Sequence, residues 1–294
     1  MEQKVLLIGN DINNATESYS WSDLIDRLIH FAKIDKAINK VNKPFPLLYE
    51  EIYLRSAAEF STTESSIKKF IASETERLKP NPLHSAILDL GVENLLTTNY
   101  DLSFEKASGT DLKKCKNQGI IKENTYNLFR YHKTDSHKIW HIHGSETNPN
   151  SITLGYEHYS GYLQQMRNYT ASGTIGTYKA KDFHSLIRRI KENAVLDESW
   201  VDFFFTKDIY IFGLNLDFVE LHLWWLFTFR ARAKVENRCA VTNKIIYFYP
   251  EGKEKDSAHK LEMFRAVGIE TIAQKSTGDK MQYYLNIINR IKKE

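Results

Sequence analysis

The segment Val5-Leu6-Leu7-Ile8-Gly9-Asn10-Asp11 sets the fold of this chain. Four apolar residues in a row predict a strand buried on both faces, and the glycine directly after them predicts a turn. Five further runs predict strands at residues 94–98, 138–144, 208–214, 244–249 and 269–272. Three of these also end in glycine or in polar residues. A ligand site is therefore expected where those ends meet.

Helical patterns lie between the strand patterns. They cover residues 21–31, most of 35–88, 217–234, 258–267 and a basic amphipathic stretch at 280–293. Strands that alternate with helices predict an α/β fold, with a parallel sheet covered by helices on both faces. In such sheets ligands bind outside the carboxyl ends of the strands. The apolar helix at 217–234 is interpreted as a core element or as part of a subunit interface.

The composition describes an ordinary globular protein. The 294 residues carry a formal net charge of +3, without the concentrated basic excess of a dedicated nucleic-acid binder. Cys115 and Cys239 are the two cysteines, too few for a disulfide framework or a four-cysteine zinc module. We expect one domain over residues 1–294, with a mainly helical insertion at about 35–88 and a lid or second insertion at about 145–200.

Neither a signal peptide nor a membrane span is expected. The first apolar run is too short for a signal peptide, and the most apolar stretch, at 209–229, contains Asn215, Asp217, Glu220 and His222. The expected location is the cytoplasm.

Two polar motifs follow predicted strands, and each has two interpretations. Gly9 suits a dinucleotide site, where glycine lets the backbone approach a pyrophosphate, but it equally suits a plain turn. Residues 97–101 read Thr-Thr-Asn-Tyr-Asp. The amide of Asn99 and the carboxylate of Asp101 suit a ribose diol and a carboxamide, or they cap a following helix near Leu102.

The segment His141-Ile142-His143-Gly144 places two imidazoles on one face of a strand. A histidine at a strand end next to glycine suits a general base, although a buried structural histidine is the commoner case. Zinc binding by this pair is disfavoured, because no third ligand has suitable spacing. His132 and His137 lack such a context and are expected on the surface or in loops.

Together these motifs resemble the sirtuin-like family, in particular its bacterial anti-phage branch of NAD-degrading effectors. The resemblance is carried by Leu7-Ile8-Gly9-Asn10, Trp21-Ser22-Asp23-Leu24, Thr97-Thr98-Asn99-Tyr100-Asp101, His141-Ile142-His143-Gly144-Ser145, Leu154-Gly155-Tyr156-Glu157 and Ile211-Phe212-Gly213-Leu214-Asn215. It covers most of the chain and implies a Rossmann-like, sirtuin-type sheet that takes NAD as its substrate.

The resemblance also implies roles for individual residues. Asn99 would hold the nicotinamide ribose hydroxyls or the attacking water, and His143, directly before Gly144, would be the general base. Asp101 would contact the nicotinamide amide. The remaining contacts would come from Gly9, Asn10 and Ile12 around the pyrophosphate and nicotinamide, and from Thr98, Gly213, Leu214 and Asn215 around the adenosine half.

The chain departs from the family pattern at two points. Asp11 stands where a small residue or a second glycine is usual, so this cofactor-site residue would repel the pyrophosphate unless it turns away to cap the next helix. The four-cysteine zinc module of the family's deacylases is also missing, so no metal is expected. Since acyl-lysine substrates dock beside that module, the resemblance implies NAD cleavage rather than deacylation.

The expected function is therefore an NAD+ hydrolase that releases nicotinamide and ADP-ribose and depletes NAD in anti-phage defence by abortive infection. Uncontrolled NAD loss would be toxic, so we expect a homo-oligomer, a separate activating partner such as an ATPase or sensor, or both. The alternatives are a sensor that binds NAD or ADP-ribose without cleaving it and, less favoured, an NAD-dependent deacylase. The basic end at Arg290, Lys292 and Lys293 is explained by a solvated helix face, and no sequence-specific nucleic-acid binding is expected.

Overall fold

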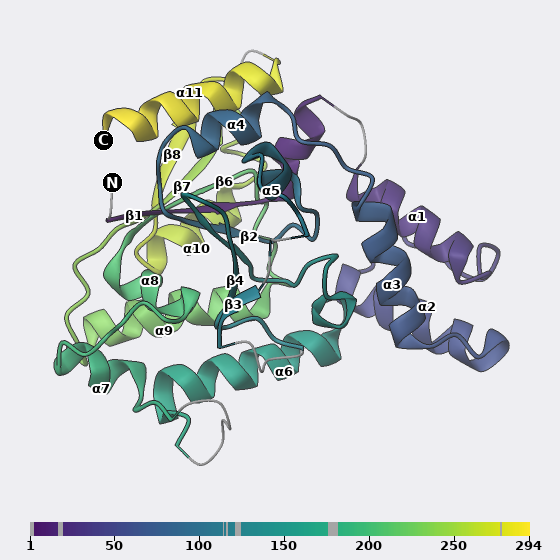
Figure 1. The fold of residues 1–294 in the computed structure, drawn as a ribbon, viewed down its shortest axis with the longest axis horizontal. Helices are drawn as coiled ribbons and strands as arrows, with labels where there is room; N and C mark the ends of the chain where they lie inside the picture. Colours follow the sequence, from purple (N-terminus) through teal and green to yellow (C-terminus); the bar gives the residue numbers. More distant parts are fainter. Residues whose placement is uncertain are drawn as a thin grey trace.

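The computed structural model describes residues 3–16, 20–113, 115, 117–120, 125–175, 182–276 and 278–294. Eight strands of these residues form one sheet in the order β3-β4-β5-β2-β1-β6-β7-β8 (Figure 1). The strands are β1 (Lys4–Ile8), β2 (Asn94–Thr97), β3 (Asn117–Gly119), β4 (Arg130–Lys133), β5 (Lys138–His141), β6 (Asp208–Phe212), β7 (Ile245–Pro250) and β8 (Glu270–Gln274).

The six strands from β5 to β8 in this order pair in parallel, and all six were predicted from the sequence. Numbered along the chain, these six strands lie in the spatial order 3-2-1-4-5-6, which is the Rossmann arrangement. The order reverses at the boundary between β1 and β6. That boundary opens a crevice at the carboxyl ends of the strands.

At one edge, two strands that the sequence patterns did not predict extend the parallel sheet. β3 and β4 are antiparallel, and β4 pairs with β5. Their sequences, Asn-Gln-Gly and Arg-Tyr-His-Lys, lack the apolar run by which the buried strands were found. Short polar strands at an edge are one way in which proteins discourage pairing with other chains.

Helices cover both faces of the sheet (Figure 1). Alternate strand residues point to opposite faces. Val5 and Leu7 pack in the core with α8 (Trp200–Thr206), α9 (Leu221–Val235) and α10 (Ala258–Ala266). Leu6 and Ile8 pack in the opposite core with α4 (Pro82–Leu88) and α11 (Lys280–Lys293). The α9 positions Leu223, Leu226 and Phe227 belong to the first core, so its inner face serves packing.

A third apolar cluster lies beside the sheet, where three helices project in Figure 1. They are α1 (Trp21–Phe31), α2 (Phe45–Phe60) and α3 (Glu64–Thr75). The predicted bounds of α1 are confirmed, and Ser20 and Asp23 form the capping box that starts it. Within residues 35–88, α4 instead contacts α5 (Ser103–Ala107) and α11.

Residues 145–200 contribute further short elements, with 176–181 lying outside the described part. These elements are η2 (Pro149–Ser151), α6 (Tyr156–Arg167), η3 (Asn168–Ser172) and α7 (Leu186–Lys191), while η1 (Asn10–Ala15) follows β1. Among the helices that the structure describes, none combines the length and apolar character needed to cross a bilayer.

Candidate functional site

A cavity of about 600 Å³ lies at the carboxyl ends of β1, β2, β5 and β6. Its size falls in the range of small-molecule and cofactor sites. The sheet side of its wall comes from the segments that follow these strands, and the opposite side comes from the α1 to α3 region. The lining residues are Asn10, Asp11, Asn14, Ser20, Trp21, Leu24, Lys43, Pro44, Phe45, Thr75, Leu78, Thr98, Asn99, Tyr100, Asp101, His143, Tyr159, Gly213, Leu214, Asn215, Asp217, Val219 and Glu220.

Nine of the eleven predicted site residues line this cavity. They are Asn10, Asp11, Thr98, Asn99, Asp101, His143, Gly213, Leu214 and Asn215. The other two, Gly9 and Ile12, do not line it, and Ile12 is fully buried in the core below η1. The switch point of the sheet therefore brings together motifs that are more than a hundred residues apart.

Gly9 lies against the loop that follows β6. Its N–H donates to the carbonyl of Phe212 at 3.1 Å, and the N–H of Asp11 donates to the carbonyl of Gly213 at 3.0 Å. A Cβ on Gly9 would lie 2.3 Å from the Gly213 oxygen, which is far inside contact distance. Gly213 itself has a φ of +68°, in the region that favours glycine. These glycines let two loops meet at the crevice.

The Asp11 carboxylate turns toward α11. One oxygen accepts a hydrogen bond from Lys280 Nζ at 2.6 Å, and the other accepts one from the hydroxyl of Tyr284 at 2.5 Å. Asp11 lies inside η1 and caps no helix, because its carboxylate bonds to α11 instead. Lys280 supplies a positive charge beside this anion, so Asp11 is not an uncompensated charge at the cavity.

Asp101 caps the following helix and also contacts the loop that follows β1. One carboxylate oxygen accepts the backbone N–H of Ser103 at 3.0 Å, which helps start α5. The other accepts the side-chain amide of Asn13 at 3.0 Å, and the same amide donates to Asn10 Oδ1 at 2.8 Å. Asn13 was not predicted as a site residue. It ties the loop after β1 to the loop after β2 at the cavity.

Asn99 is held by its backbone and leaves its side chain uncommitted. Its N–H donates to Thr97 Oγ1 at 3.1 Å, and its carbonyl accepts from His141 Nδ1 at 2.8 Å. The side-chain Oδ1 is buried and has no hydrogen-bond partner among the described residues. A buried amide oxygen without a partner is costly, and a ligand in the cavity could satisfy it.

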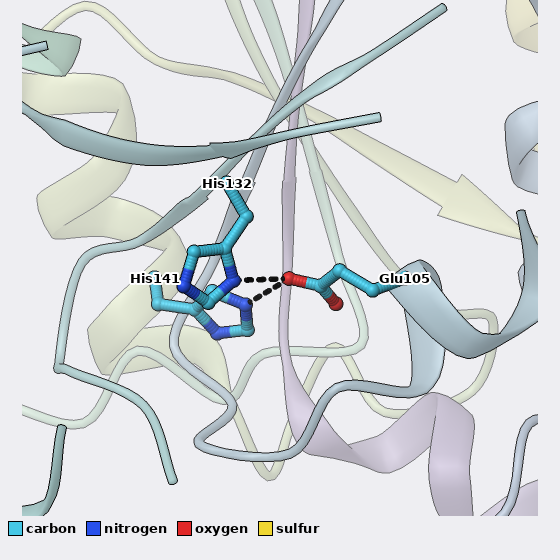
Figure 2. Close-up of side chains that lie close together, drawn as sticks. All are labelled: Glu105, His132 and His141. Atoms are coloured by element: carbon cyan, nitrogen blue, oxygen red, sulfur yellow. Dashed lines mark hydrogen bonds and ion pairs between the residues drawn. The ribbon is translucent and has the colours of Figure 1, made fainter. Parts of the chain in front are cut away.

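Behind Asn99 lies a buried cluster of Glu105, His132 and His141, which Figure 2 shows. One oxygen of Glu105 lies 2.6 Å from His132 Nδ1 and 2.8 Å from His141 Nε2. Burial would lower the pKa of His141, but the Glu105 carboxylate outweighs it and raises that pKa to about 9. Burial would also raise the pKa of Glu105, and the two histidines instead hold it well below its ordinary value. The charged pair thus fixes the ring that holds the Asn99 carbonyl.

His132 and His137 are both buried, so neither lies on the surface, but His137 does lie in a loop, the one between β4 and β5, as one of the two expectations had it. His132 lies in β4, a strand that the sequence patterns did not predict. His137 Nε2 lies 3.2 Å from the carbonyl oxygen of Leu88. The pairing of His141 with His143 as ligands of one site was already disfavoured. The structure separates them, because His141 faces Glu105 whereas His143 faces α9 and the segment before it.

His143 meets two residues that the sequence did not single out. Its Nε2 lies 3.1 Å from His222 Nε2 and 3.3 Å from Glu220 Oε2. Burial lowers the pKa of His143 to about 3, so the ring is neutral near pH 7. Burial raises the pKa of Glu220 to about 8, although a hydrogen bond from Tyr159 partly opposes that rise. Glu220 and His222 interrupt the apolar run at 217–234. That interruption was the one sequence signal by which these two site residues could have been found.

The comparisons with known proteins agree with this site. Residues 93–189 match the family model described as a SIR2-like domain. The match contains β2, β5 and both Asn99 and His143. No curated protein matches the chain.

Proposed function

We propose that this chain is an NAD+ hydrolase that releases nicotinamide and ADP-ribose, because residues 93–189 match a SIR2-like domain. SIR2-like domains bind NAD and are in general NAD-dependent enzymes. The observation that carries the proposal is that the unpartnered Oδ1 of Asn99 and the neutral ring of His143 belong to one cavity at the sheet's switch point. Buried polar groups aimed at a common space are expected of a binding site rather than of a packed core.

The proposed chemistry is loss of nicotinamide followed by capture of water. The bond between ribose and the cationic pyridinium breaks with an oxocarbenium-like transition state, and nicotinamide leaves as a neutral molecule. Asn99 would hold the ribose diol or the attacking water. His143 would accept a proton from that water, because its ring is neutral and one of its nitrogens carries a lone pair.

The residues around His143 suit this transfer. The carboxyl group of Glu220 lies 3.3 Å from the ring nitrogen, and in its ionised form it would stabilise the imidazolium that forms. The Glu105–His141 pair would keep Asn99 in position through its carbonyl. Rigid placement of the water and the ribose would add to the rate gain expected from such a site.

The rest of NAD would extend along the crevice. Thr98, Gly213, Leu214 and Asn215 are proposed for the adenosine half, and Asn10 for the pyrophosphate, with Asp101 at the nicotinamide amide. Gly9 would act by letting the two loops meet, and Ile12 by supporting η1 from below. The charge of Asp11 would be masked by Lys280 rather than pointed at the phosphates.

The biological role is part of the same proposal. The chain would deplete NAD as an effector of anti-phage defence by abortive infection, acting in the cytoplasm. Its activity would be low in the isolated chain and would rise when it assembles as a homo-oligomer or meets an activating partner such as an ATPase or sensor. Residues 35–88 would form an insertion and residues 145–200 a lid or insertion, within one domain.

The decisive experiment is incubation of the purified, metal-free chain with NAD, followed by chromatography of the products. Asn99→Ala and His143→Ala should each lower turnover at least about a hundredfold, which is the usual scale for a positioning group or a base. His30→Ala, at an exposed histidine far from the cavity lining, is the control and should leave turnover unchanged.

Near-normal turnover in either site variant would refute the roles assigned to Asn99 and His143. NAD that binds in a calorimetric titration but stays intact would favour the sensor alternative. Release of nicotinamide only in the presence of an acylated peptide would favour the deacylase.

A further inference from the structure

The second histidine cluster of this site consists of His143, Glu220 and His222. Each offers one ligand atom, and the three atoms lie within 4.8 Å of one another. His143 and His222 are buried, and His143 and Glu220 line the cavity. Two imidazoles and a carboxylate form a donor set that suits zinc and related transition metals.

The spacing of these atoms fits a metal. Zinc binds histidine nitrogen and carboxylate oxygen at about 2.0–2.2 Å in a tetrahedral arrangement, which puts neighbouring ligand atoms roughly 3.3 Å apart. Here the two Nε2 atoms are separated by 3.1 Å, and His143 Nε2 is 3.3 Å from Glu220 Oε2. The corresponding distances in the Glu105 cluster are 2.6 and 2.8 Å, which are lengths of charge-assisted hydrogen bonds. The two clusters are therefore of different kinds.

Hydrogen bonding leaves the second cluster incomplete. A single N–H can join the two rings, but Glu220 Oε2 is buried and has no hydrogen-bond partner among the described residues. No lysine or arginine of the described part pairs with Glu220. A bound cation would give Glu220 Oε2 the partner that it lacks. One unsatisfied group would remain. His222 Nδ1 would carry the proton of the metal-bound ring, and it also has no hydrogen-bond partner among the described residues.

We propose that His143, Glu220 and His222 bind a divalent transition metal, with Zn²⁺ as the natural occupant. The three side chains would supply three ligands, and the fourth position would open toward the cavity, as in zinc sites that keep an exchangeable ligand. Two nitrogen ligands make Mg²⁺ or Ca²⁺ a poor fit, because these ions prefer oxygen.

A metal at this cluster would switch the enzyme off, an inference that rests on the proposed function. A neutral imidazole has one lone pair. When His143 Nε2 gives that pair to zinc, Nδ1 carries the proton, so neither nitrogen can accept another. Zinc would thus block the candidate base directly, and its removal would restore it.

The test is a titration of the full chain after dialysis against a chelator. Zn²⁺ added in a calorimeter should bind one ion per chain, and Co²⁺ should give the strong visible absorption of a tetrahedral site. Glu220→Gln and His222→Gln should each weaken Zn²⁺ binding at least about tenfold, the range seen when a metal site is disturbed. His30→Ala removes an exposed histidine beside Asp35 and should leave the affinity unchanged.

Absence of one-to-one binding would overturn the metal site. So would unchanged binding in Glu220→Gln, whose partly exposed side chain makes it the safer variant should the fully buried His222 not tolerate replacement. NAD turnover is measured separately, without metal and with one equivalent of Zn²⁺. Turnover that persists with zinc bound would overturn the inhibition, whereas absence of turnover in the metal-free chain would refute the hydrolase and not the metal site.

Discussion

Replacement of Glu105 by glutamine tests how the buried charge network supports the site. Glu105 is fully buried, and one of its oxygens contacts both His132 and His141 (Figure 2). The substitution keeps the shape of the side chain but removes its charge. His141 then loses the carboxylate that keeps its ring protonated at neutral pH, so the buried ring must either give up its proton or stay charged without a counter-charge.

The expected loss follows from the two hydrogen bonds. Each charge-assisted bond contributes about 1.5–3 kcal/mol, and breaking a buried ion pair by removing one partner typically costs about 3–5 kcal/mol. We therefore expect Glu105→Gln to lower the free energy of unfolding by about 3–5 kcal/mol at pH 7. NAD turnover should also fall, because His141 Nδ1 donates to the Asn99 carbonyl at 2.8 Å.

The assay is urea denaturation followed by circular dichroism, with Glu93→Gln as the matched control. Glu93 pairs with Lys138 at 2.8 Å, but both side chains are substantially exposed, so the same substitution should cost less than about 1 kcal/mol. A Glu105→Gln variant that is destabilised no more than the control would refute the reasoning about the buried network.

Three further predictions concern single positions. Gly9→Ala should cost about 1–3 kcal/mol of stability in urea denaturation, because its Cβ would overlap the carbonyl of Gly213; unchanged stability would contradict that contact. Asp11→Asn should change the KM for NAD by less than about threefold in steady-state kinetics, since Lys280 already offsets the charge; a large fall in KM would mean that Asp11 repels the phosphates. Burial raises the pKa of Asp202 to about 6 from 3.8, so the folded state holds this proton more tightly than the unfolded state. Stability should therefore fall by up to about 3 kcal/mol as the pH rises from about 4 to about 6, and Asp202→Asn should remove this dependence in denaturation series at several pH values; an unchanged pH profile would contradict the assignment.

The parallel strands and the position of the site followed from local patterns. Val5 to Ile8 is apolar without interruption because both faces of β1 are covered, and the polar residues after each strand mark the carboxyl edge. The edge strands β3 and β4 carry no such pattern. They join the sheet through β5, and the pairing of two strands cannot be predicted from the sequence of either strand alone.

The contacts of His141 and His143 also could not be predicted from the sequence. His141 and His143 are two residues apart, yet one meets Glu105 and the other meets Glu220 and His222. Nothing in the spacing of these residues along the chain predicts the contacts. They arise because the tertiary packing brings Glu105 of α5 to His141 and brings the start of α9 to His143.

The sequence by itself determined the α/β class, the six parallel strands and the motifs that end at one edge, because hydrophobic periodicity and turn residues act locally. The tertiary structure alone decided which side chains face one another: Asp11 with Lys280, Asn99 with His141, and His143 with Glu220 and His222. Distances between groups far apart in the chain depend on how the layers pack. Those distances set the charge of each buried group, and with it the chemistry that this site can perform.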